Sequence, residues 1–470
     1  MRCSRFLVLI VPTLVVGACG GDDDFVGVRD GARAFVTSDP PGGRILVDGL
    51  PTSLVTPDTV NGLLGRHDLT VRLDTLGASY RYSAQVMLSH PDSTANVSGP
   101  LLLRCGSDDC LDQLARESAV NRLRFATNPG GALFHGGPNG SGIVWPATTS
   151  NRYAFAGMPM ISARPYPDTI GLGIYDTDYL AGRPFPGLVE EDGRIWLRQS
   201  TWIVPPVNAL PLATIRGIRI DQTVLAAAAV DDVVVARLVF RNITGDPLYR
   251  LVDPNVPGDS MTFPNTYVGF ALDGDVGDSA DDYLSYDLDH DLAFIYDATF
   301  EEPAFDREHR NRPGLIGLRM LDAPPGATVV LNGWARAPGA ATDWNAGRLN
   351  EGTGWGMMSG QRVYAPDHDD LRIGYMPPAP LDLRAMVSAG PFTLAPGDSV
   401  AITIAVIVAE PAAGTFTSGE PVEPGEPTDV SRPIHRIAQP LFERARAAEA
   451  LLPELIAPSS PRREGSSRNK

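Results

Sequence analysis

The chain has 470 residues and a formal net charge of −17, from 56 acidic and 39 basic side chains. This length leaves room for two or three domains, each able to bury a core. So acidic a surface repels nucleic acid, which excludes nucleic-acid binding as a main role. Glycine (48 residues) and proline (42 residues) make up close to a fifth of the chain, which favours short strands joined by turns. We therefore expect a mainly β protein.

The first nineteen residues have the pattern of an export signal. Two arginines precede an apolar stretch, residues 6–16, which is too short to span a bilayer comfortably. The segment Val16–Cys19 (VGAC) resembles the cleavage box of bacterial lipoproteins, which implies that Cys19 becomes the lipidated N-terminal residue. The alternative is an ordinary secretory signal cut at Ala18. Residues 20–32 would form a flexible tether, and the protein would be lipid-anchored in the bacterial envelope, at the outer membrane and on its periplasmic or exposed face.

Two further cysteines, Cys105 and Cys110, are separated by four residues. In an oxidising compartment such a pair can form a small-loop disulfide. A metal site is the less favoured alternative, because neither a second cysteine pair nor a nearby histidine pair completes it. Residues 105–120 also predict a short helical link, since three apolar side chains share one helical face.

Residues 33–104 predict a small antiparallel β-module. Apolar and polar side chains alternate from Leu69 to Leu73, as in a strand with one buried face, and Asp48-Gly49 is a tight-turn signal. The module resembles a PEGA domain, which implies a β-sandwich-like module typical of bacterial envelope and surface proteins, without a catalytic role. The motifs that carry the resemblance are Ser38-x-Pro-x-Gly42, Ile45-x-Val-Asp-Gly49, Thr56-Pro57 and Gly65-x-His67, although the name-giving tetrapeptide reads Pro40-Pro41-Gly42-Gly43.

Residues 121–410 predict a large antiparallel domain of the β-sandwich type. Asp232–Asn242 alternates like a half-buried strand, and Val400–Val408 is apolar on both faces, as a central strand is. Scattered segments resemble large secreted or surface proteins of Bacteroidota-like bacteria. These segments are Trp145-Pro146, the acidic Val268–Tyr296 and Ser388–Asp398. The resemblance implies that the acidic segment is a fixed structural loop, and it implies no enzymatic activity.

The chain beyond residue 410 divides into three parts by composition. Residues 411–432 are rich in proline and predict a linker that does not fold. Residues 433–456 predict a helix that docks on the domain or, alternatively, meets a partner. Its apolar face comprises Leu441, Ala445, Ala448 and Leu452. Residues 457–470 are polar and basic, which predicts a disordered tail.

The most chemically loaded stretch is Tyr267–Tyr296, with eight aspartates between Asp273 and Asp291. Closely spaced carboxylates on a glycine-containing turn supply the hard oxygen ligands that calcium prefers. The spacing is not that of an EF-hand, and magnesium is less favoured because it tends to keep its waters. The alternative is a solvated acidic loop. We predict a structural calcium site with ligands from Asp273, Asp275, Asp278, Asp281, Asp282 and Asp287.

No catalytic set stands out in the sequence. Gly258-Asp259-Ser260 and Asp306-Arg-Glu-His309 are similar to two blocks of GDSL-type hydrolases, but in that family the blocks lie far apart in an α/β fold. A His-Glu-x-x-His motif and a phosphate-binding glycine loop are absent from the sequence. We therefore expect no enzyme.

Five tryptophans leave a second interpretation open. They would either line a sugar-binding face or fill the core of the sandwich, and we favour a position in the core. They are Trp196, Trp202, Trp334, Trp344 and Trp355. We expect a non-enzymatic, lipid-anchored envelope protein that acts in binding or scaffolding, with a glycan or another envelope protein as its ligand. The alternative is a carbohydrate-binding or carbohydrate-active surface lipoprotein, similar to a glycoside hydrolase.

Overall fold

The computed structural model describes the part of the chain that follows the predicted tether. The described residues are 31–75, 78–103, 115–128, 131–135, 142–164, 169–171, 179–181, 189–203, 215–246, 249, 260–335, 348–349, 353–360, 379–425 and 431–456. The predicted export signal with Cys19, the pair Cys105 and Cys110, and the tail 457–470 lie outside them. The fold is mainly β with antiparallel sheets and few helices, as predicted. Among the described residues, the helices fall short of the length and apolarity that crossing a bilayer requires.

The N-terminal module is built from eight strands. They are β1 (Arg33–Asp39), β2 (Arg44–Val47), β3 (Leu50–Val55), β4 (Asp58–Asn61), β5 (Gly65–Thr75), β6 (Ala78–Leu88), β7 (Thr94–Pro100) and β8 (Leu102–Leu103). One sheet has the order β4-β1-β7 and the other the order β8-β6-β5-β2-β3. The pairing of β1 with β7 is parallel, whereas an all-antiparallel module was expected. The predicted turn is present, because Val47 pairs with Leu50 and both Asp48 and Gly49 have positive φ.

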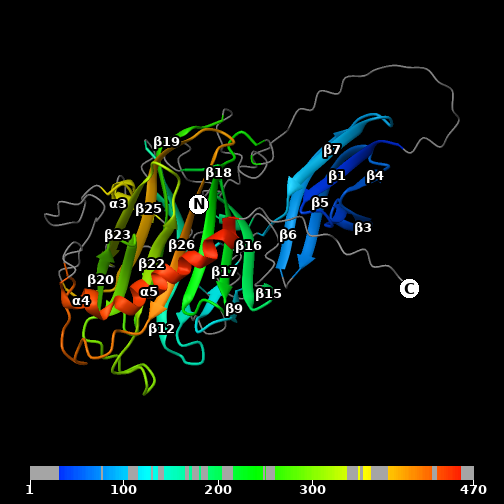
Figure 1. The fold of residues 1–470 in the computed structure, drawn as a ribbon. Coiled ribbons are helices and arrows are strands. Elements are labelled where there is room, and N and C mark those ends of the chain that lie inside the picture. The colour runs from blue at the N-terminus through cyan, green and yellow to red at the C-terminus, as the bar shows by residue number, and fades with distance from the viewer. Residues whose placement is uncertain are drawn as a thin grey trace, which may run out of the picture.

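The large domain consists of two sheets that enclose one core. Its strands are β9 (Arg116–Ala119), β10 (Arg124–Thr127), β11 (Ile143–Val144), β12 (Arg152–Ser162), β13 (Thr169–Gly171), β14 (Tyr179–Ala181), β15 (Val189–Glu191), β16 (Arg194–Ile203), β17 (Ile218–Ala227), β18 (Val233–Asn242), β19 (Phe263–Gly274), β20 (Asp282–Asp287), β21 (Leu292–Asp297), β22 (Leu315–Asp322), β23 (Thr328–Ala335), β24 (Arg348–Leu349), β25 (Leu383–Leu394) and β26 (Ser399–Ala409). A short helix, α3 (Thr353–Met358), precedes β25. Figure 1 shows the two layers of strands with the module beside them.

The order of the strands links the two parts of the chain. The first sheet of the large domain runs β23-β25-β19-β12-β11-β10-β9. The second runs β20-β21-β22-β26-β18-β17-β16-β14 and continues into the module, because Ala181 of β14 pairs with Leu103 of β8. Strand β9 occupies the end of the predicted helical link. Its backbone hydrogen bonds are made with β10 at the sheet edge instead of within a helix. Tertiary context therefore overrides the local helix propensity.

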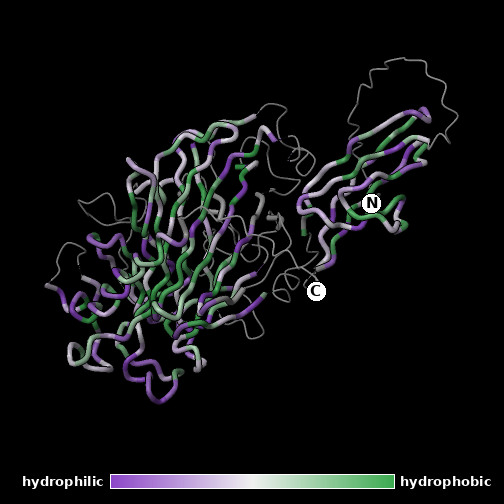
Figure 2. The backbone as a smooth tube through the Cα atoms, turned by 45° about the vertical axis from the view of Figure 1, so that its right-hand side comes forward, coloured by the Kyte–Doolittle hydropathy of each residue, from purple (hydrophilic) through white to green (hydrophobic). Residues whose placement is uncertain are grey.

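The second sheet is buried on both faces. Alternate side chains of β18 and β26, such as Leu238 and Ile404, enter the core between the two sheets. The intervening ones, such as Val235 and Ile407, lie under the C-terminal helix. This arrangement confirms the prediction that Val400–Val408 forms a central strand that is apolar on both faces. Figure 2 shows hydrophobic strands in the middle of the domain and hydrophilic turns at its ends.

The C-terminal helix docks on this sheet, as predicted. It is divided into α4 (Pro433–Ile437), α5 (Gln439–Ala448), a short 3-10 turn η2 (Glu449–Leu451) and α6 (Leu452–Ile456). Helix α5 crosses the sheet over β22 and β26 (Figure 1). Its buried side chains are Leu441, Phe442, Ala445 and Ala448, so three of the four side chains of the predicted apolar face pack on the sheet. The fourth, Leu452, lies beyond the 3-10 turn and is half-buried, and Leu451 is buried instead.

We expect Leu441→Ala to lower the free energy of unfolding by roughly 2 to 3 kcal/mol. Leu441 is fully buried, and its truncation leaves a cavity between α5 and the sheet. Urea unfolding measures the change. Glu443→Ala, on the exposed side of the same helix, is the control, with an expected change within about 0.5 kcal/mol. An equal loss in both variants would contradict the docked helix.

The proline-rich segment packs on the domain, unlike the predicted linker. Residues 411–425 form neither helix nor strand, but they lie against the loop that follows β21. Their contacts are Gly419 N to Thr299 O (2.9 Å), Val422 N to Ala298 O (2.7 Å) and Phe416 to Phe300 (ring centroids 4.7 Å apart). The segment is held because these hydrogen bonds and the partial burial of Phe416 and Val422 offset the loss of chain entropy.

Candidate metal centre

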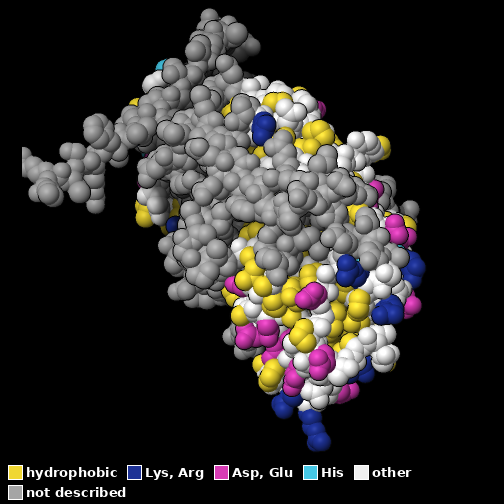
Figure 3. Space-filling model, turned by 90° about the vertical axis from the view of Figure 1, so that its left-hand side faces the viewer, with side chains coloured by type: hydrophobic (Ala, Val, Ile, Leu, Met, Phe, Trp, Pro, Cys, Tyr) yellow, Lys and Arg dark blue, Asp and Glu magenta, His cyan; other side chains and the backbone are white. Residues whose placement is uncertain are grey.

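The acidic stretch forms one end of the large domain. Strand β19 ends there, β20 begins there with Asp282, and β21 ends there with Asp297, which is paired with Asp282 across the ladder. The structure arranges the carboxylates in two clusters, Asp273–Asp275–Asp382 and Asp281–Asp297–Glu302. In each cluster, one carboxylate oxygen of every residue lies within 4.8 Å of the others. Figure 3, which looks from the side of β20 and α4, shows further acidic side chains gathered on the lower part of the domain.

The first cluster is compensated by arginines. The Arg384 guanidinium, on β25, lies 3.1 Å from Asp273 and also pairs with Asp382. Nη2 of Arg152 lies 3.7 Å from the Asp275 carboxylate. Burial raises the pKa of Asp275 to about 6, and the charge of Arg152 opposes this rise. Because cationic partners are already present, this cluster is a buried ion-pair network that does not require a metal.

The second cluster lacks a cationic partner among the described residues. Asp297 is fully buried, and its Oδ1 accepts hydrogen bonds from Thr299 and from the backbone of Glu301. Its Oδ2 and the Oδ1 of Asp281 are buried and have no hydrogen-bond partner within the described part of the chain. A buried carboxylate oxygen without a partner is costly, and a cation removes that cost.

Burial and mutual repulsion shift the pKa values of Asp281, Asp282 and Asp297 upward. Burial and the negative charge of Asp297 raise the pKa of Asp281 to about 7. Burial also raises the pKa of Asp297, and it raises that of Asp282 well above its usual range. A bound proton or a bound cation would relieve the repulsion among these carboxylates near neutral pH.

Glycine shapes the approach of the ligands. Gly277 has a φ of 78°, and a Cβ at this position would collide with the carboxylate of Glu302. Only glycine combines this conformation with the close approach. Oε2 of Glu302 accepts a hydrogen bond from the backbone N–H of Asp278 at 2.8 Å, which holds the carboxylate against the loop.

The structure divides the six predicted ligands. Asp273 and Asp275 belong to the first cluster and Asp281 to the second, so one common site is not formed. Asp282 is buried between the clusters, where its Oδ2 accepts a hydrogen bond from Val276 N. Asp278 is exposed, and its backbone rather than its carboxylate contacts Glu302.

The prediction of Asp287 as a ligand of the same ion is wrong. It lies at the other end of β20, about 17 Å along the strand from Asp282. Its Oδ1 accepts hydrogen bonds from the backbone N–H groups of Asp289 and His290 and closes the turn to β21. The sequence interpretation also missed Asp297, Glu302 and Asp382, which enter the clusters from other segments. Asp297 and Asp382 stand at strand ends and Glu302 in a loop, and a lone carboxylate at such a position is too common to identify a ligand.

The residues similar to GDSL-type hydrolases are not brought together. Ser260 precedes β19, whereas His309 lies beyond the far end of that strand, where its ring packs on Trp145. The strand separates them by about 36 Å. Nδ1 of His309 lies 3.0 Å from the Asp306 carboxylate and serves a local turn. The described Ser260 and His309 therefore cannot act on one substrate atom.

The three tryptophans whose side chains the structure describes do not share one exposed face. Trp334 is buried in the core, and Trp196 is partly buried on the face of the second sheet that the C-terminal helix covers. The ring of Trp355 is covered by the guanidinium of Arg164 at 3.8 Å. Trp344 and the side chain of Trp202 lie outside the described residues. This placement favours packing over a sugar-binding platform.

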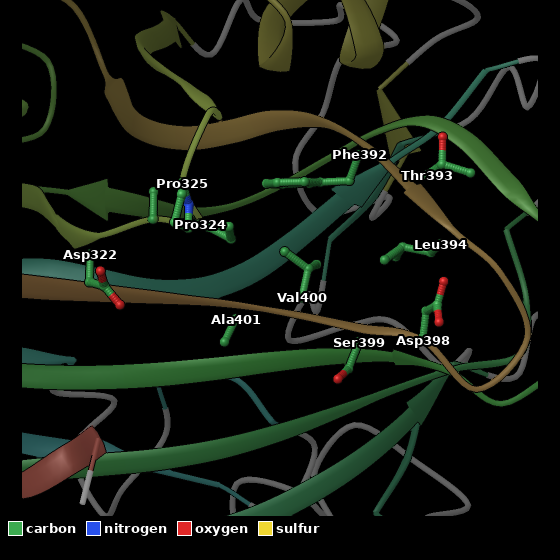
Figure 4. A pocket seen from close by; sticks show the side chains of 11 residues that line it. Asp322, Pro324, Pro325, Phe392, Thr393, Leu394, Asp398, Ser399, Val400 and Ala401 are labelled. Carbon is green, nitrogen blue, oxygen red and sulfur yellow. The ribbon is translucent and has the colours of Figure 1, made fainter.

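A groove of about 480 Å³ lies between the β22–β23 loop and the β25–β26 hairpin. Figure 4 shows Phe392, Leu394 and Val400 within it and the carboxylates of Asp322 and Asp398 at its two ends. Oδ2 of Asp398 accepts a hydrogen bond from Ala395 N and stabilises the hairpin turn. Asp322 is paired with Thr403 of β26, five residues beyond Asp398, so about 17 Å of strand separates the two positions and their carboxylates do not act as a pair.

The comparisons with known proteins add no relative. No protein-family model matches the chain, and a search of curated proteins found no match. The resemblances to PEGA domains and to surface proteins of Bacteroidota-like bacteria therefore stay predictions. The candidate metal centre rests on the geometry of its own residues.

Proposed function

We propose that this chain is a non-enzymatic, lipid-anchored protein of the bacterial cell envelope, whose calcium-stabilised β-sandwich acts in binding or scaffolding. The second cluster carries the metal part of the proposal. Asp281, Asp297 and Glu302 place three carboxylate oxygens within 4.8 Å of one another, and Asp281 and Asp297 each have a buried oxygen without a hydrogen-bond partner among the described residues. The VGAC box at Cys19 and the PEGA-like motifs support the envelope location.

Calcium fits the donor set of the second cluster. The cluster offers oxygen atoms only, and calcium takes six to eight hard oxygen ligands in a flexible arrangement. Zinc prefers sulfur and imidazole ligands, and magnesium usually binds one or two carboxylates and keeps several waters. Asp281, Asp297 and Glu302 would hold the ion, which supplies the positive charge that the cluster lacks.

Calorimetric titration with calcium chloride tests the proposal. We expect the wild-type chain to bind calcium and Asp297→Asn to lose the binding, because the substitution removes a ligand charge while Oδ1 keeps its hydrogen bonds. Asp287→Asn is the matched control, since Asp287 lies in the same acidic stretch but outside the cluster. A wild-type chain that binds no calcium, or an equal loss in both variants, would contradict the site.

We also expect calcium to protect the proline-rich segment from proteolysis. The loop that holds this segment, residues 297–302, supplies two of the three ligands. Chelation leaves these carboxylates to repel each other, which loosens the loop and the contact of Phe416 with Phe300. Cleavage by chymotrypsin after Phe416 should become about tenfold faster in chelator. Asp297→Asn should be cleaved at one rate with and without calcium, and a calcium effect that persists in this variant would argue against the coupling.

A further inference from the structure

The exposed large apolar side chains of the described residues all lie in the N-terminal module. They are Phe35, Leu50, Val55, Leu64 and Met87, with exposed fractions of 45%, 73%, 50%, 57% and 67%. The described part of the large domain, although it has far more residues, has none. Apolar side chains that gather on one part of a surface indicate a surface that meets a partner.

Three of these side chains lie at one end of the module. Leu64 immediately precedes β5, Met87 is paired with Arg66 near the end of β6, and Leu50 follows the turn between β2 and β3. His67 connects this turn to Leu64. Its Nδ1 lies 2.8 Å from Oδ2 of Asp48, and its Nε2 lies 3.3 Å from the carbonyl oxygen of Leu64. We call Leu50, Leu64 and Met87 the apolar end.

The chain enters the module at the apolar end. Leu63 N donates a hydrogen bond to Ala32 O at 2.8 Å, so residue 32, where the predicted tether ends, lies beside Leu64. The opposite end of the module joins the large domain, because Leu103 pairs with Tyr80 and with Ala181. Strands β5 and β6 separate the two ends by about 30 Å. In Figure 1 the start of β1 points away from the large domain.

We propose that the apolar end rests on the membrane that holds the lipid anchor, with its three side chains among the phospholipid headgroups. This proposal rests on the proposed lipidation of Cys19. The predicted tether, which precedes the buried Ala32, would span roughly 20 Å as a glycine-containing coil, so it would keep the module close to the bilayer and raise the effective concentration of the apolar end there. Arg66 beside Met87 and Asp48 beside Leu50 give this end both signs of charge, which favours zwitterionic over anionic lipid.

Hydroxyl-radical footprinting of Met87 tests the proposal. The lipidated full-length protein is inserted into phosphatidylcholine vesicles, and intact-mass analysis establishes the acyl chains. On these vesicles we expect Met87 to be oxidised about fivefold more slowly in the wild type than in Leu50→Asp/Leu64→Asp, because two added charges keep the end out of the headgroup region. Val55→Asp is the matched control, since Val55 is an equally apolar, half-exposed side chain of β3, and this variant should behave like the wild type.

Each result decides something. A mature protein without acyl chains overturns both the anchor and the docked apolar end. A lipidated protein in which Met87 is oxidised equally fast in the wild type and in the double variant overturns the docked end alone. Protection of Met87 that appears without vesicles and grows with protein concentration assigns the surface to a second copy of the chain and also overturns the proposal.

Discussion

Calcium should raise the melting temperature of this protein, and the rise should be larger at pH 8 than at pH 5. An ion that binds only the folded state at 1,000 times its Kd stabilises that state by about 4 kcal/mol. The binding site would be the Asp281–Asp297–Glu302 cluster, whose buried oxygens lack other partners among the described residues. Calorimetric melting scans in calcium and in chelator, repeated across this pH range, measure the effect.

The pH dependence follows from the raised pKa of Asp281. Its ordinary value is 3.8, and burial together with the charge of Asp297 raises it to about 7 in the folded protein. Between these values the folded apoprotein binds more protons than the unfolded chain, so its stability falls as the pH rises. Calcium takes the place of the protons. The difference in melting temperature between calcium and chelator therefore grows as the pH rises through the same range. Equal gaps at both pH values would exclude Asp281 as a ligand.

Asp297→Asn separates a metal ligand from a structural carboxylate. In chelator this variant should be at least as stable as the wild type, because one of the repelling charges is gone while Oδ1 keeps its hydrogen bonds. With calcium it should gain little. A variant that is strongly destabilised in chelator would instead identify Asp297 as a structural carboxylate that needs its charge.

Arg384→Ala should lower the free energy of unfolding by about 3 to 5 kcal/mol, with or without calcium. Arg384 is 4% exposed, and its guanidinium bridges Asp273 and Asp382. Truncation leaves buried carboxylates, including Asp275 close by, without the charge that balances them. Urea unfolding in calcium and in chelator measures both parts of the prediction.

Two further variants make this prediction specific. Arg152→Ala removes a partly exposed arginine from the same cluster, and the expected loss is at most about 1 kcal/mol. In Arg384→Ala/Asp273→Asn the loss should be smaller than the sum of the single losses, since the two residues form one ion pair. Recovery of Arg384→Ala by calcium would show that the first cluster is a metal site as well.

The two clusters explain how one acidic stretch is accommodated in a packed domain. The first is largely compensated from within, because strands β12 and β25 bring two arginines to its three carboxylates at the end of β19. The second has backbone donors on its loop but lacks a described cationic side chain, so its balance depends on what binds from solution. If the second cluster binds calcium as proposed, the same end of the domain combines a permanent ion-pair network with a site that depends on the calcium concentration.

Local pattern alone determined several features of this protein. The glycine- and proline-rich composition indicated a mainly β fold, and the run Val400–Val408 indicated a strand buried on both faces. The spacing of Leu441, Ala445 and Ala448 predicted the buried face of the C-terminal helix. These inferences hold because the spacing of apolar side chains in a strand or a helix is a property of neighbouring residues and depends little on the rest of the chain.

Only the tertiary structure decided which charges meet. Arg384 reaches Asp273 through the pairing of β19 with β25, two strands far apart in the sequence. Asp297 reaches Asp281 through the β20–β21 hairpin, and Glu302 through the loop that follows it. Residues 116–119, predicted as part of a helix, form a strand because they pair with β10 at a sheet edge. The segment whose composition predicted a linker packs on the domain through the contact of Phe416 with Phe300. Charge compensation and edge pairing depend on distances in space. These distances cannot be inferred from how closely aspartates follow one another along the chain.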